Sequence, residues 1–258
     1  VRSVAQAHKG PAKVVFVDAA GYRGKMKEGQ EAAMKALTEL AEAPVPAYKG
    51  CPKKVILAGL GSDDFRLDQD TKALQKLAGE NIELQVLANT TAEELEKAAN
   101  ADLILTVGYG EAYGKRMNQK YGIPWKSLDY PYGLTGAQEF WQSLGEQFGD
   151  PQGIWKIGYE TAESAFRSHT GESLSKVYSY LQALYSMPAA VIGAKAKCHG
   201  MKRFLEQELG MEVVVCAERE QVTDVERFYD KVRQSEAAVL FGSSFERELA
   251  EELEIPLV

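Results

Sequence analysis

The feature of this sequence that most constrains its fold is a recurring unit. A short run of apolar, mostly β-branched residues is followed by a glycine-containing turn and a segment with helical periodicity. Most of the runs are continuously apolar rather than alternating, which is typical of strands buried on both faces of a parallel sheet. We therefore predict an α/β fold with two or more Rossmann-like, doubly wound lobes that contain parallel sheets and are joined by a helical segment.

Seven strands and eight helices are expected from this pattern. The predicted strands are 13–17, 54–58, 83–87, 102–107, 189–192, 212–216 and 237–241. One predicted helix begins at Thr91, and the others are 29–42, 68–77, 111–121, 135–148, 200–209, 223–234 and 245–253. The best-defined helix start is Thr91, because its hydroxyl can cap the helix while Glu94, three residues later, reaches back.

Two breaks divide the chain, at the proline-rich stretch 43–52 and at Gly149-Asp150-Pro151. The stretch 159–185 has no strand signal and is expected to form one or two bridging helices. We predict a leading strand–helix unit (1–48), a middle Rossmann-like lobe (49–150), a helical bridge (151–186) and a last Rossmann-like lobe (187–258), truncated at its C-terminus. The absence of an initial methionine and the apolar ending suggest a fragment of a larger protein.

Charge and composition exclude several classes of protein. The formal net charge is -7, with acidic and basic residues interspersed, so no basic stripe is available for nucleic acid. The apolar runs are far shorter than the roughly 20 residues that cross a bilayer, so we expect no membrane partner. The three cysteines, Cys51, Cys198 and Cys216, are too few and too scattered for a disulfide framework. We therefore expect a cytoplasmic protein.

Ligands of open parallel sheets bind at the carboxyl ends of the strands. The loops expected there are 59–64, 89–91, 108–110, 193–200, 217–221 and 242–244. Gly59-Leu60-Gly61-Ser62 lacks the third glycine of a dinucleotide fingerprint, and no Walker pattern is present. Gly108, Tyr109 and Gly110 are candidate cofactor contacts, with a plain tight turn as the alternative reading.

Ser243 and Ser244 lie on a strand-to-helix turn that can hold an anion, so they too are candidate cofactor contacts. A helix N-cap explains the serine pair equally well, and we favour the cap.

Cys198 and His199 are the candidate metal ligands and also candidate cofactor contacts. They lie in 193–200, predicted to be a loop before a helix that starts near Gly200, where a thiolate and an imidazole can bind a cluster or a tetrapyrrole metal. The helix N-terminus and two nearby lysines are expected to lower the pKa of the Cys198 thiol. The alternative is a solvated loop. Cys216, at the end of a buried strand, and Cys51, in a linker, are expected to be structural.

No hydrolytic triad is assembled by the sequence. There is no Gly-x-Ser-x-Gly elbow, and no spacing places any of the three histidines near a nucleophile. Catalysis, where present, is therefore expected to depend on a bound cofactor.

Five segments, taken in order, resemble the nitrogenase component 1-like oxidoreductases, which include nitrogenase subunits, their cofactor-assembly scaffolds and the dark-operative tetrapyrrole reductases. The segments are 20–29, 117–125, 130–140, 200–211 and 241–258. The resemblance covers nearly the whole chain. It implies paired homologous subunits of stacked Rossmann-like domains, which receive electrons from an ATP-dependent iron–sulfur reductase.

The resemblance also shows what this chain lacks. Family members with a cluster at the subunit interface hold it with cysteines from a region that would precede Val1, and no cysteine follows the segment 105–108, where the nitrogen-reducing subunit has its cofactor thiolate. An iron–sulfur or related metallocluster is therefore expected in the full-length complex, and none in this fragment.

The leading hypothesis is a subunit fragment of an electron-accepting reductase or assembly scaffold, which holds a metallocluster or a tetrapyrrole-like substrate between its lobes. The loops 108–110 and 193–200 are expected to open toward that shared cleft. The fragment alone is expected to be inactive. The alternative is a metal-chelate or small-molecule binding protein without catalytic activity, because two Rossmann-like lobes joined by a helix also describe such receptors.

Overall fold

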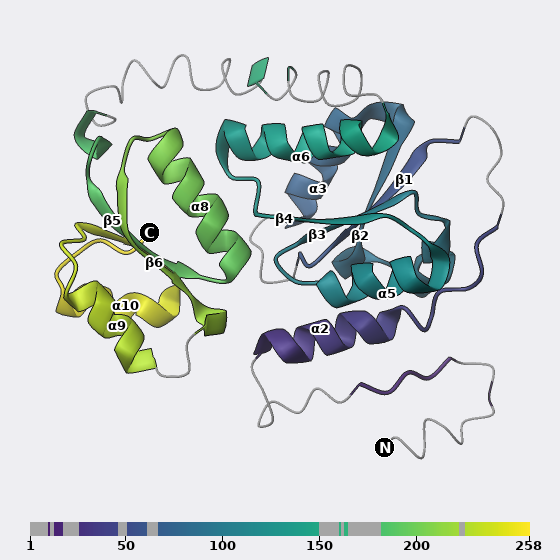
Figure 1. The fold of residues 1–258 in the computed structure, drawn as a ribbon, viewed down its shortest axis with the longest axis horizontal. Coiled ribbons are helices and arrows are strands. Elements are labelled where there is room, and N and C mark those ends of the chain that lie inside the picture. Colours follow the sequence, from purple (N-terminus) through teal and green to yellow (C-terminus); the bar gives the residue numbers. More distant parts are fainter. Residues whose placement is uncertain are drawn as a thin grey trace. The chain divides into compact units, whose positions relative to one another are not determined.

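A computed structural model describes residues 10, 13–17, 26–45, 51–60, 67–149, 160, 163–164, 182–221 and 225–258. The chain divides into two compact units, Val1–Leu128 and Asp129–Val258. Both contain a parallel sheet flanked by helices (Figure 1). The α/β class with parallel sheets, predicted from the sequence, is confirmed.

The sheet of unit 1 has four parallel strands in the order β2-β1-β3-β4. Their bounds are Lys53–Ala58 (β1), Ile82–Val86 (β2), Leu103–Val107 (β3) and Trp125–Leu128 (β4). β1 and β3 lie in the middle, where Val55 to Ala58 and all of β3 are buried. Apolar runs at these two positions, broken only by Thr106 in β3, are typical of strands covered on both faces.

Helices surround this sheet. They are α2 (Met26–Leu37), α3 (Leu67–Ala78), α4 (Ala92–Glu96) and α5 (Glu111–Tyr121), with the short 3-10 turns η1 (Gly79–Asn81), η2 (Leu87–Asn89) and η3 (Lys97–Asn100). One core cluster joins Ile56 and Ile104 of the sheet to Tyr113 and Met117 of α5, and Met34 of α2 packs against it. Figure 1 shows α2 beside α5. The predicted bounds of α5 and the cap at Thr91 are confirmed.

The sheet of unit 2 has the order β6-β5-β7, again parallel. The strands are Pro188–Gly193 (β5), Glu212–Glu218 (β6) and Val239–Phe241 (β7). The last residues extend the sheet beyond β7, because Leu240 N donates to Pro256 O and Val258 N to Leu240 O, both at 2.9 Å.

In the described part of unit 2, the helices with defined bounds are α6 (Gly133–Phe148), α8 (Lys195–Gln207), α9 (Val225–Arg233) and α10 (Arg247–Glu252), with the 3-10 turns η4 (Arg219–Gln221) and η5 (Ser244–Glu246). Alternation along β5 separates two cores. Ala189 and Val191 pack with α8, whereas Ala190 and Ile192 pack with α9 and α10. Figure 1 accordingly shows α8 on one face of this sheet and α9 and α10 on the other.

Two predictions at the level of elements are wrong, and one strand is missing from the predicted set. Residues 13–17 form no strand; Val14 is exposed, and Lys13 is tied by ion pairs to Glu42 and Glu96 rather than placed in a ladder. The predicted loop 193–200 is helical from Lys195 onward. β4 was not expected, because Trp-Lys-Ser-Leu at a sheet edge has no apolar run.

Of the predicted bridge 159–185, only Glu160, 163–164 and 182–185 are among the described residues, and the four-part domain division stays a prediction. Within the described part of the chain, no helix combines the length and the apolar character needed to cross a membrane.

Candidate functional site

At the strand ends of unit 1, the turn 108–110 is held tightly by the protein itself. Gly108 and Gly110 have positive φ, 83° and 98°, and Tyr109 N donates to Val107 O at 3.1 Å. A Cβ at Gly59, the residue after β1, would lie 1.8 Å from Tyr109 O. The backbones of the two strand ends are therefore in direct contact. These glycines thus fit the interpretation as a tight turn.

The N-terminus of α5, directly after this turn, already has an anion. The Glu31 carboxylate, from α2, accepts hydrogen bonds from Gly110 N and Ala112 N, each at 2.7 Å. Free N–H groups at such a position bind phosphates in nucleotide-binding proteins. Here two of them are taken by a side chain that lies 79 residues away in sequence from Gly110.

Unit 2 repeats this arrangement twice. Lys195 N, at the start of α8, donates to Glu220 Oε2 at 2.9 Å. The first turn of α6 is capped by Glu208, which accepts from Leu134 N at 2.9 Å and from Thr135 N at 2.8 Å. Three long helices thus start on carboxylates supplied by remote parts of the same chain.

Cys198 is one turn inside α8, fully buried, and its thiol donates to Ala217 O at 3.3 Å. The pKa of the Cys198 thiol is raised well above its usual value, first by its interaction with the Cys216 thiol and second by burial. The expected lowering of this pKa is therefore wrong. It assumed an exposed loop at a helix N-terminus, whereas the thiol faces the core and the sheet.

His199 points away from that core, toward acidic groups. Its Nε2 lies 2.9 Å from Glu218 Oε1, and its Nδ1 lies 3.8 Å from Asp129 Oδ1. Both ring nitrogens therefore face carboxylates. Within the described ranges, no group of three or more His, Cys, Asp or Glu side chains is arranged to hold a metal ion. Adjacent in sequence, Cys198 and His199 thus point into different surroundings, and their role as metal ligands stays a prediction.

The turn η5 begins at Ser244, and Ser243 before it forms the N-cap that the sequence favours. Its Oγ accepts from Phe245 N, while the Glu246 carboxylate accepts from Ser243 N at 2.8 Å and from Ser243 Oγ at 2.9 Å. Glu246 has no exposed surface and pairs with Arg219 of η4. The turn thus fixes an ion pair between a buried carboxylate and an exposed guanidinium, and Ser244 remains exposed.

Glycine lets α8 approach the chain at the start of unit 2. A Cβ at Gly200 would lie 2.3 Å from Tyr130 O, and Tyr130 N donates to Ala196 O at 3.2 Å. The Tyr130 ring lies under Lys197 Nζ, 5.0 Å from the centroid. The motifs 130–136 and 200–205, read separately in the sequence, therefore belong to one contact.

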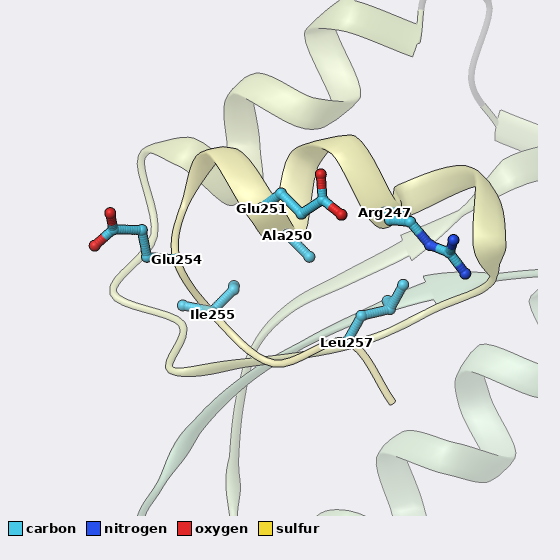
Figure 2. Close-up of a pocket in the computed structure, with 6 residues that line it drawn as sticks. All are labelled: Arg247, Ala250, Glu251, Glu254, Ile255 and Leu257. Atoms are coloured by element: carbon cyan, nitrogen blue, oxygen red, sulfur yellow. The ribbon is translucent and has the colours of Figure 1, made fainter.

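One hollow lies apart from all these groups. It has a volume of about 450 Å³ and is lined by α10 and by the terminal segment, with Arg247, Glu251, Ile255 and Leu257 among its residues (Figure 2). None of the predicted site residues lines it. The carboxyl ends of β5 and β6 remain a better candidate site than this hollow. Catalysis and metal binding require titratable side chains, and these are gathered at the strand ends.

Sequence reasoning missed the residues that complete these sites, namely Glu31, Asp129, Glu208, Glu218, Glu220 and Glu246. A partial signal existed for two of them, because the loop 217–221 was expected at a strand end. The others come from helices or from the connection between units, where acidic residues are ordinary surface residues.

The fold and these sites define an α/β protein of two Rossmann-like units whose strand-end helices are capped internally. Over residues 1–258 the sequence matches the family described as "Nitrogenase component 1 type Oxidoreductase", and the chain belongs to that family. The predicted resemblance is thereby confirmed.

Solved structures agree with this assignment. "Nitrogenase Cp1 at pH 6.5" superposes with a TM-score of 0.66 at 17% identity, covering 92% of this chain and 58% of that one. "Nitrogenase Cp1 at pH 5" gives a TM-score of 0.65 at 15% identity, covering 92% and 57%. The chain thus spans less than two thirds of these relatives, and the likeness shows the fold.

A Mn-bound periplasmic metal binding protein from candidatus liberibacter asiaticus reaches a TM-score of 0.49 at 14% identity, covering 80% of this chain and 88% of that one. A similarity this weak carries no functional argument. No curated protein matches the sequence.

Proposed function

We propose that this chain is part of an electron-accepting oxidoreductase subunit of the nitrogenase component 1 type and binds no nucleotide itself. The observation that carries the proposal is the internal capping of α5 and α8 by Glu31 and Glu220, in a chain whose family match spans residues 1–258. In this proposal ATP is hydrolysed by a separate iron–sulfur reductase, and electrons reach this chain from that partner.

Electrostatics supports the proposal that the nucleotide binds to the partner rather than to this chain. A nucleotide phosphate at the start of α5 would have to displace Glu31 from two charge-assisted hydrogen bonds, each 2.7 Å long. Such bonds contribute roughly 1.5–3 kcal/mol each, and a phosphate close to the carboxylate would also be repelled. Rossmann-like lobes filled in this way serve as scaffolds rather than as nucleotide sites.

The described cysteines do not fit an iron–sulfur cluster. Such clusters are held by several thiolates, commonly four. Cys198 is buried and bonded to a backbone carbonyl, Cys216 lies beside it, and Cys51 belongs to the other unit. Family members generally bind iron–sulfur clusters, so we propose that the ligands come from a homologous partner subunit or from residues outside the described ranges.

The proposal places the protein in the cytoplasm, in a complex with a homologous component 1 subunit and an ATP-dependent iron–sulfur reductase. Reductase and cofactor-assembly scaffold are two versions of it. In the first, the bound group stays with the subunit and passes electrons to a substrate. In the second, a finished metallocluster leaves the complex.

The test compares the chain alone with the chain plus its partners. In equilibrium dialysis against MgATP and NADH, the isolated chain is expected to show no saturable binding. In an assembled complex, ATP-dependent reduction of the bound group, followed by electron paramagnetic resonance, is expected to require the reductase. Micromolar binding of either nucleotide to the isolated chain would overturn the proposal.

A further inference from the structure

Two thiols that are distant in sequence lie together in unit 2. Cys198 belongs to α8 and Cys216 to β6, and both are part of the same core cluster. The Cys198 thiol donates to the carbonyl of Ala217, the residue after Cys216, at 3.3 Å. Ala217 belongs to the core cluster on the other face of the sheet, whereas Cys216 packs against the cluster that contains Cys198. Both are free cysteines.

The two thiols differ in access and in environment. Cys198 has no exposed surface, whereas Cys216 is only partly buried. Cys216 is therefore the thiol that a peroxide from solvent reaches first.

We propose that Cys198 and Cys216 form a reversible disulfide site, at which Cys216 reacts first with a peroxide and Cys198 then closes the bond. In the first step the Cys216 sulfur attacks one peroxide oxygen, the O–O bond breaks, and hydroxide leaves, so that a sulfenic acid forms. In the second step the Cys198 sulfur attacks the Cys216 sulfur, the S–O bond breaks, and the hydroxide leaves as water with the Cys198 proton. Two thiols lose two electrons, and hydrogen peroxide becomes two waters.

The packing explains why this pair suits a reversible reaction. Cys198 is already held toward β6 by its bond to Ala217 O, so closure needs no long-range movement of the chain. The disulfide would fix α8 to β6 and remove the thiol that donates to that carbonyl. This inference does not rest on the proposed electron-accepting function, because it uses only groups within unit 2.

The experiment treats the full chain, carrying Cys51→Ser to prevent cross-linking through its exposed thiol, with hydrogen peroxide under otherwise anaerobic conditions. Remaining thiols are then alkylated and the protein is mapped by non-reducing peptide mass spectrometry. The expected product is a peptide pair joined through Cys198 and Cys216, which a dithiol reductant separates again. Recovery of both cysteines as alkylated thiols, at peroxide levels that oxidise exposed Cys51 in the parent protein, would overturn the proposal.

Single variants test the order of the two steps. In Cys198→Ser, Cys216 is expected to accumulate as a sulfenic acid that dimedone traps. In Cys216→Ser, the buried Cys198 is expected to react at least about tenfold more slowly. Equal trapping at the two positions would contradict the assigned roles. The peptide map of the protein with both cysteines needs neither variant, so a variant that fails to fold leaves the main test intact.

Discussion

The two units have the same kind of sheet but different chemistry at the strand ends. In unit 1, the turn at Gly108–Gly110 packs backbone against backbone with Gly59, and Glu31 fills the start of α5. In unit 2, the corresponding edge gathers two thiols, an imidazole and several carboxylates around α8 and β6. A parallel sheet alone therefore does not make a ligand site, because side chains from other elements decide whether its edge is filled or reactive.

Remote capping is the feature that the two units share. Glycine also packs closely in unit 2, at Gly200, but crowding of glycine at the strand end itself is found in unit 1, at Gly59, and not at Gly193 of unit 2. The comparison predicts that backbone crowding dominates stability in unit 1, whereas charge pairing dominates at the edge of unit 2. Substitutions in each unit can separate these two contributions.

The largest effect is expected for Gly59→Ala in unit 1. The new Cβ would lie 1.8 Å from Tyr109 O, in a backbone with φ of 96°. Left-handed strain and overpacking together are expected to lower the free energy of unfolding by about 4 kcal/mol. Chemical denaturation measures it. The matched control is Gly79→Ala, where φ is 69° and nothing lies within 4 Å of the new Cβ, so only the conformational strain applies. Equal losses in the two variants would show that crowding at Gly59 is unimportant.

A smaller effect is expected for Arg219→Ala in unit 2. This change leaves the buried Glu246 carboxylate without its cation, although Ser243 still donates to it. Because the Arg219 side chain is 40% exposed, we expect a loss of about 2 kcal/mol, below the range for a fully buried pair. Thermal and denaturant unfolding both report it. Lys202→Ala, which removes an ion pair to Glu206 between two exposed side chains of unit 2, is expected to change stability much less, and the reverse ranking would refute this assignment.

The smallest effect is expected for Thr91→Ala, which removes the capping box of α4 and lowers stability by about 1 kcal/mol. Thr91→Ser keeps the hydroxyl and should retain most of the stability that the cap provides. Backbone and side-chain hydrogen bonds from Thr91 lower the pKa of Glu94 in the folded protein. The stability that the Glu94 carboxylate adds to the cap is therefore present above its unfolded pKa of about 4.3 and is lost as the pH falls through its lower folded pKa. An unchanged difference between wild type and Thr91→Ala at acidic pH would contradict this.

Much of the fold was predictable because its central strands carry their own signal. The run at Val55–Ala58 is continuously apolar, the run at Leu103–Val107 is interrupted only by Thr106, and the structure buries both. The start of α8 was misjudged because its first residues lie between two glycines, although Ala-Lys-Ala-Lys is a good helix-forming sequence.

The candidate site was less predictable, since its partners are separated by long stretches of chain. Glu208 caps Leu134 across 74 residues, and Glu220 caps Lys195 across 25. No local pattern marks such contacts. Cys198 was recognised as notable, but Cys216 was expected to be structural because it ends a buried strand, and no thiol motif links two cysteines 18 positions apart.

The most direct test of the central claim, that the chain's own carboxylates fill its anion sites, is the melting temperature of wild type and Glu31→Ala as a function of added inorganic phosphate. We expect Glu31→Ala to melt at a lower temperature than wild type, and phosphate to restore part of the loss by binding the freed Gly110 and Ala112 N–H groups. Wild type and the exposed-residue control Glu80→Ala should respond equally little. Stabilisation of wild type by phosphate to the same extent as Glu31→Ala would contradict the account, because the start of α5 would then be open in the native protein.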